Sequence, residues 1–163
     1  MNLAVLFLVL LTTFTRSEFA RQPPDFSGSW KFDQAKSMQQ PGPDGRIVLA
    51  AMLGEEFAAR QESSTLQLTI KTGSQTVTAT YKLDGTESVN MSPGDIPVTS
   101  RAAWEDHKLV IRSTSKTREK GAVVTIQSKR VLWLDKSGDL IIERTGSPAG
   151  SVTPSRSVYT KVR

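Results

Sequence analysis

Residues 25–37 read DFSGSWKFDQAKS, with a glycine two positions before a tryptophan at the start of a short alternating run. Alternation of apolar and polar residues is typical of a strand with one buried face. A glycine lets another segment pass close to the backbone, and a large aromatic side chain can fill one end of a barrel. We therefore predict that Gly28 and Trp30 are structural residues of a first strand that covers 26–33.

Further strand-like runs follow along the chain, each closed by residues that are typical of turns. They cover 65–72, 75–83, 86–91, 96–105, 108–116, 122–134, 139–145 and 155–162. Asp84-Gly85 predicts a hairpin turn between two of them. About eight to ten strands with short links favour an all-β, antiparallel up-and-down barrel over a sandwich, because a Greek key needs a long crossing connection.

The segment between the predicted first strand, 26–33, and the run at 65–72 is ambiguous. Gln39–Asp44 is a Pro/Gly loop, and a short helix near residues 46–53 is favoured by its Ala and Leu, with Gly54 ending it. A strand kinked at Gly54 fits nearly as well. Either alternative leads into a strand over 55–61.

The amino-terminal residues predict export. LAVLFLVLL, residues 3–11, is too short to span a bilayer as a helix but suits the apolar region of a signal peptide. We expect a signal peptide over 1–17, cleaved after Ser17 or alternatively after Ala20, then a linker over 18–25 and one domain over 26–163. An uncleaved anchor is the less favoured alternative, and no membrane span is expected after cleavage. The protein is then periplasmic or secreted.

Charge and cysteine content exclude several classes of function. The chain has no cysteine, which excludes a disulfide framework, a thiolate metal site and a catalytic thiol, and in an exported protein favours a bacterial source. The net charge is +5, with the basic residues scattered along the strands. The dense run KTREK, 116–120, also holds Glu119 and predicts a solvated hairpin loop. We therefore expect no nucleic-acid partner.

No catalytic arrangement is recognisable. The single histidine, His107, lies in a polar turn without a second ligand at metal-binding spacing, and GSPAG, 146–150, lacks the pattern of a nucleophile elbow. The sequence therefore predicts a protein that is not an enzyme, with no catalytic residue, no metal and no cofactor.

The opening stretch resembles the Gly-x-Trp motif of the calycins, the lipocalins and fatty-acid-binding proteins. Over its length the chain is similar to exported bacterial lipocalin-like proteins, with a DFSGxWKxDxxKS opening, LDGxES at Leu83–Ser88 and a basic last strand that ends in Tyr. The resemblance implies a barrel that holds a small hydrophobic or amphipathic ligand, and a basic side chain of the last strand over Trp30. Lys161 and Arg163 are the candidates for that cation, the alternative being that both face solvent.

The candidate ligand-lining residues are aromatic side chains in phase with other apolar positions. They are Tyr81, Trp104, Trp133 and Tyr159. The alternative is that these four fill the core, because small barrels can be packed solid. The protein would then be an interaction module of the bacterial cell envelope, without a small-molecule ligand, that uses its basic exterior on anionic partners.

Fatty-acid-binding proteins carry Arg-x-Tyr on the last strand to grip the ligand carboxylate. This chain has Arg156-Ser157-Val158-Tyr159, whose extra residue places the Arg and Tyr side chains on opposite faces of a strand. Arg112 and Arg144 are alternative residues for gripping a carboxylate, unless they point outward into solvent. The sequence does not indicate an oligomeric state.

Overall fold

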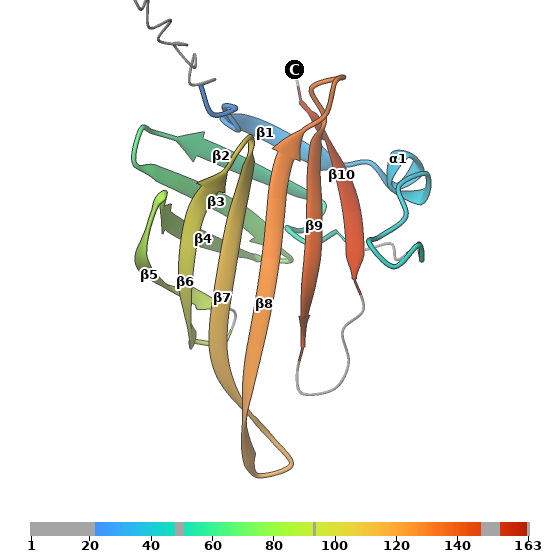
Figure 1. The fold of residues 1–163 in the computed structure, drawn as a ribbon. Coiled ribbons are helices and arrows are strands. Elements are labelled where there is room, and N and C mark those ends of the chain that lie inside the picture. Colours follow the sequence, from blue (N-terminus) through green and yellow to red (C-terminus); the bar gives the residue numbers. More distant parts are fainter. Residues whose placement is uncertain (1–21, 48–50, 93, 148–153, 163) are drawn as a thin grey trace, which may run out of the picture.

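Ten antiparallel strands form a nearly closed barrel in the computed structural model, which describes residues 22–47, 51–92, 94–147 and 154–162 (Figure 1). The elements are β1 (Gly28–Phe32), α1 (Gln34–Met38), β2 (Glu56–Gln61), β3 (Thr65–Thr72), β4 (Gln75–Lys82), β5 (Asp84–Ser92), β6 (Ile96–Glu105), β7 (Lys108–Glu119), β8 (Ala122–Leu134), β9 (Leu140–Ser147) and β10 (Ser155–Lys161). The predicted signal peptide, 1–17, lies outside the described residues, as does 18–21 of the linker.

The strands pair in the order β4-β3-β2-β1-β10-β9-β8-β7-β6-β5. Every neighbour in this order is also a neighbour along the chain, except that the first strand pairs with the last, where Trp30 lies opposite Lys161. This is the arrangement of an up-and-down barrel, and it confirms the fold class expected from the alternating runs.

The barrel has one seam, between β4 and β5, where side chains take the place of a backbone ladder. Asn90 Oδ1 accepts a hydrogen bond from Thr80 N at 2.7 Å, and Asn90 Nδ2 donates to Thr80 O at 3.0 Å. Ser88 Oγ accepts from Lys82 N at 2.9 Å. Below, "the seam" means this junction. Its strands are therefore held together by two side chains of β5.

The turn predicted at Asp84-Gly85 does connect β4 to β5, but the two strands lack the backbone ladder of a hairpin. Asp84 Oδ1 accepts from Thr86 N at 2.9 Å and from Thr86 Oγ1 at 2.6 Å, so the carboxylate closes a local turn at the start of β5. The pairing of β5 with β6 also shifts register between Asp84 and Glu87. The turn and the bulge place β5 in the ladder with β6, while β4 and β5 lie side by side without a backbone ladder.

The short helix lies directly after β1, not near residues 46–53. Asp33 caps α1 by accepting a hydrogen bond from Lys36 N at 2.8 Å, and the buried Ser37 accepts one from Val158 N at 2.9 Å. Of the stretch predicted as helix, residues 46–47 and 51–53 are not helical, and 48–50 lie outside the described residues. No helix in the described part of the chain is long and apolar enough to cross a bilayer.

The core fills the half of the barrel around Trp30. Its largest fully buried members are Trp30, Tyr159, Phe26, Leu66, Leu68, Leu109, Ile111, Leu132, Leu140 and Ile142. They occupy inward positions on strands from both sides of the barrel, as the period-two alternation predicts. We call this half the closed end, and the opposite half the open end.

Candidate functional site

A cavity of about 440 Å³ lies inside the barrel toward the open end. Its apolar wall includes Leu53, Ile70, Val77, Ala79 and Val98. These side chains come from the segment before β2 and from β3, β4 and β6, so residues distant in the sequence surround one space. The volume lies within the range of about 300–1,000 Å³ that is typical of small-molecule sites.

The cavity exists because inward side chains become smaller from the closed end to the open end. On β7, the inward residues Leu109 and Ile111 fill the core, whereas the next one, Ser113, lines the cavity. Ser113 Oγ lies 2.8 Å from Ser100 Oγ of β6, so both buried hydroxyls are satisfied. Ser128 lines the cavity in the same way on β8. Serine at these positions leaves space that leucine or isoleucine would occupy.

The opposite wall of the cavity is basic. Arg130 on β8 and Arg144 on β9 lie opposite each other in the strand register, and both line the cavity. Arg130 Nη2 donates to Tyr81 Oη at 2.7 Å, with its guanidinium 5.6 Å from the Tyr81 ring centroid. No carboxylate side chain is among the residues that line the cavity. The two cations therefore favour an anionic group in this wall.

Tyr159 fills the core and positions the cavity wall without lining it. Its hydroxyl accepts a hydrogen bond from Leu53 N at 2.9 Å and donates one to Gly54 O at 3.1 Å. The rings of Phe57 and Phe32 meet its ring edge-on, with centroids at 5.1 and 5.6 Å. Burial raises the pKa of Tyr159 to about 12, and the hydrogen bond from Leu53 opposes this shift. Tyr159 thus holds Leu53, which does line the cavity.

The two tryptophans proposed as cavity residues lie elsewhere. Trp104 packs at the closed end, 5.6 Å from Phe26 between ring centroids. Trp133 lies on the outside of the barrel, with Lys108 Nζ 4.5 Å and the Arg156 guanidinium 5.7 Å from its ring centroid. The alternation had been ambiguous there because residues 131–134 are all apolar; the inward position of Leu132 places Trp133 outside.

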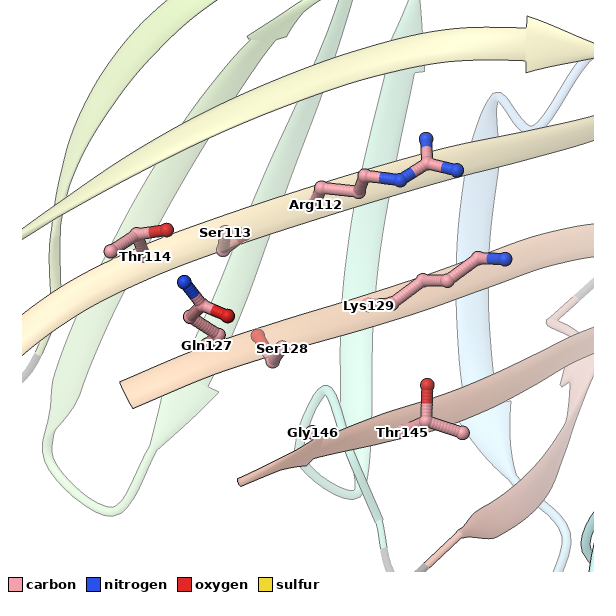
Figure 2. A pocket seen from close by; sticks show the side chains of 8 residues that line it. All are labelled: Arg112, Ser113, Thr114, Gln127, Ser128, Lys129, Thr145 and Gly146. Carbon is pink, nitrogen blue, oxygen red and sulfur yellow. The ribbon is translucent and has the colours of Figure 1, made fainter. Parts of the chain in front are cut away.

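Of the predicted arginines, Arg144 lines the cavity and Arg112 does not. Arg112 points outward and binds Glu105, with Nη2 2.9 Å from Oε1. It borders a shallow depression of about 530 Å³ on β7, β8 and β9, whose residues Figure 2 shows on three neighbouring strands. The floor of this depression includes Gly146, where an added Cβ would lie 2.5 Å from Gln127 O. The depression has mainly polar side chains and is open to solvent, so the interior cavity is the better candidate site.

The motif residues lie where the first strand meets the last, with Lys161, one of the two candidate cations, over Trp30. Trp30 is 1 % exposed, its Nε1 donates to Phe26 O at 2.8 Å, and Lys161 Nζ lies 5.7 Å from its ring centroid. A Cβ added to Gly28 would lie 2.5 Å from Lys161 Cε, so the glycine makes room for the cation. Arg163 lies outside the described residues.

The Arg156 and Tyr159 side chains lie on opposite faces of β10. Arg156 forms an ion pair with Glu143 on the outside, whereas Tyr159 is buried inside. The expectation from their spacing is confirmed, and these two residues do not form a shared carboxylate site.

Arg130 is the site residue that sequence reasoning missed. It precedes the inward Leu132 by two residues, so the period of the strand places both on the same face. That signal could have identified Arg130, once Leu132 was recognised as inward. Among the described residues, no three His, Cys, Asp or Glu side chains come together where they could hold a metal ion.

The crystal structure of apo lipid binding protein 8 (LBP-8) from Caenorhabditis elegans matches this chain with a TM-score of 0.55 and 16 % sequence identity, over 84 % of this chain and 95 % of that one. This likeness establishes the shared fold. No family model matches the sequence. No curated protein matches it either.

Proposed function

We propose that the protein is a non-catalytic barrel that binds one small hydrophobic or amphipathic molecule, lipid-like or fatty-acid-like, in its interior cavity. The observation that carries this proposal is the cavity itself, with aliphatic side chains on one wall and two arginines without a carboxylate on the other. LBP-8, which shares the fold, is by its name a lipid-binding protein, and this supports the same class of ligand.

The polarity of the cavity suggests how an amphipathic ligand is oriented. Tyr81 already engages Arg130, whereas Arg144 has no hydrogen bond or ion pair with a described residue. An anionic head group therefore lies at Arg144, and the apolar chain extends toward Leu53 and Ile70. A charge-assisted hydrogen bond at Arg144 contributes more to the affinity for a carboxylate than to the affinity for the corresponding alcohol.

The first experiment tests this orientation with a fluorescent fatty acid, displaced by an unlabelled long-chain fatty acid or by the alcohol of the same length. Arg144→Gln should weaken binding of the acid about ten-fold, the value of one charge-assisted hydrogen bond, and weaken binding of the alcohol clearly less. Arg112→Gln is the matched control, because Arg112 lies on the outer face of the same sheet. Equal effects of the two substitutions would contradict the assignment of Arg144.

The second experiment tests whether the cavity is the site at all. Val98→Trp places an indole inside the cavity and should abolish uptake of the probe. Val89→Trp, at a position of β5 that is 63 % exposed, should leave uptake unchanged. If the wild-type protein takes up no apolar probe, the ligand-binding proposal is wrong, and an interaction module with a filled barrel replaces it.

The protein is also proposed to act outside the cytoplasm of a bacterium, in the periplasm or as a secreted protein. The apolar run at residues 3–11 and the absence of cysteine support this proposal. The absence of catalysis is proposed because His107 is exposed in the turn between β6 and β7, and no histidine, aspartate or glutamate lines the cavity.

A further inference from the structure

The hairpin between β7 and β8 extends beyond the rest of the barrel (Figure 1). The ladder of β7 with β6 ends at Ser115, and the ladder of β8 with β9 reaches only to Gln127. Between these points, residues 116–125 pair only with each other, around a turn at Lys120 and Gly121 with φ values of 49° and 85°. We call residues 116–125 the ribbon. It is a two-stranded element that no neighbouring described strand covers.

Three cations lie close together on the ribbon without an ionic partner among the described residues. Some other surface cations, such as Lys31 and Arg101, are paired with glutamates. Lys116, Arg118 and Lys120 are exposed and form no ion pair with any described residue. With Glu119, these three cations give the ribbon a net charge of +2. It therefore presents an uncompensated positive charge to an approaching surface.

An aliphatic side chain is exposed among these cations. Val123 is 64 % exposed and lies directly opposite Arg118 in the ladder, so both side chains are on the same face. Cations along a free strand edge often prevent that edge from pairing with other chains. That role would not explain why a valine is exposed among them. Cations around an exposed aliphatic residue suit a lipid interface, where the cations meet head groups and the aliphatic side chain enters the boundary.

The ribbon also lies at the end of the barrel where the cavity opens. Because consecutive strands are antiparallel, the turn between β7 and β8 is at the same end as the turn between β5 and β6. Met91, close to that second turn, lines the cavity and is 51 % exposed. A partner surface that binds the ribbon would therefore face the open end of the barrel.

We propose that the ribbon docks the protein on an anionic lipid bilayer and turns the open end of the barrel toward it. The partner is a membrane rather than a nucleic acid, because residues 116–125 contain no aromatic side chain on which bases could stack. This inference goes beyond the proposed function, since docking does not require a ligand in the cavity.

The experiment measures sedimentation of the ligand-free protein with vesicles at low salt. Vesicles of phosphatidylcholine mixed with phosphatidylglycerol should bind the protein, and vesicles of phosphatidylcholine alone should not. Each cation near an anionic surface strengthens binding about five-fold, so Lys116→Gln with Arg118→Gln should weaken it about twenty-five-fold. The matched control is Lys82→Gln with Lys136→Gln, which removes the same charge from exposed positions outside the ribbon. Val123→Ser should also weaken binding, without a change of charge.

Three results would overturn the proposal: equal loss in the ribbon and control variants, equal binding to the two kinds of vesicle, or tighter binding to a single-stranded oligonucleotide at the same salt. The ribbon variant should still bind the fluorescent fatty acid as the wild type does. Failure of fatty-acid binding with intact vesicle binding counts against the proposed function alone, and the reverse result counts against docking alone.

Discussion

At the scale of single residues, Tyr159 connects the last strand to the segment before β2. Its hydroxyl is bound by Leu53 N and Gly54 O, and its ring is fully buried. Ionisation of this phenol would put a charge in the core and remove the proton that it donates to Gly54. The protonated form is therefore required for the folded state.

This requirement predicts a loss of stability at alkaline pH. The pKa of Tyr159 is raised from 10.0 to about 12, so the folded protein holds the proton more tightly than the unfolded chain does. Its stabilising contribution is complete below pH 10 and is lost as the pH rises to 12, by up to about 3 kcal/mol. Urea unfolding of the wild type and Tyr159→Phe from pH 8 to 12 measures this loss.

The phenylalanine variant should start about 1–2 kcal/mol less stable, because the two backbone groups lose their partner. Above pH 10, the free energy of unfolding of the variant should fall less steeply than that of the wild type. Parallel curves for the two proteins would mean that Tyr159 does not titrate differently in the folded and unfolded states.

The sequence allowed some residue positions to be predicted and not others. Gly28 and Trp30 could be placed from the motif, and the closure of first strand on last made Lys161 one of two candidates for the cation over Trp30. Trp133 could not, since its own strand is apolar on both faces at that point. Whether the Trp133 side chain faces inward or outward depends on how β8 packs in the barrel. The sequence of a single strand does not determine that packing.

At the scale of elements, the alternating runs predicted the strands well, because a strand with one buried face must alternate. The connections between the strands were harder to predict. The Asp84-Gly85 pair is typical of a hairpin, but here the Asp84 side chain binds Thr86 and starts a bulged strand. The helix was misplaced because α1 is only 5 residues long and depends on its Asp33 cap and on its contact with β10.

The seam provides a prediction at this scale. Asn90→Ala removes both hydrogen bonds to the backbone of Thr80 and should lower the free energy of unfolding by about 1–2 kcal/mol. Backbone hydrogen exchange at Thr80 should become faster, because its N–H is then open to water. Thr86→Ala is the control, since it removes a hydrogen bond of the same strand away from the seam. Unchanged exchange at Thr80 in Asn90→Ala would show that the seam is held by something else.

At the scale of the whole molecule, the prediction concerns the mature chain. Export with cleavage after Ser17 should yield a protein that begins at Glu18, because the apolar run at 3–11 has the length of a signal peptide. The intact mass of protein recovered from the periplasm or medium of an expressing bacterium measures this. A full-length chain that stays with the membrane fraction would contradict it.

The seam is the line along which we expect the barrel to widen most easily. Strands joined by a backbone ladder are fixed at about 4.8 Å from each other. Strands β4 and β5 are joined through the side chains of Asn90 and Ser88, which can rotate. Widening the barrel at this line breaks a few side-chain hydrogen bonds and leaves all nine ladders between its ten strands intact. For the proposed cavity, we therefore expect that ligands of different cross-section can be bound without unfolding of any strand.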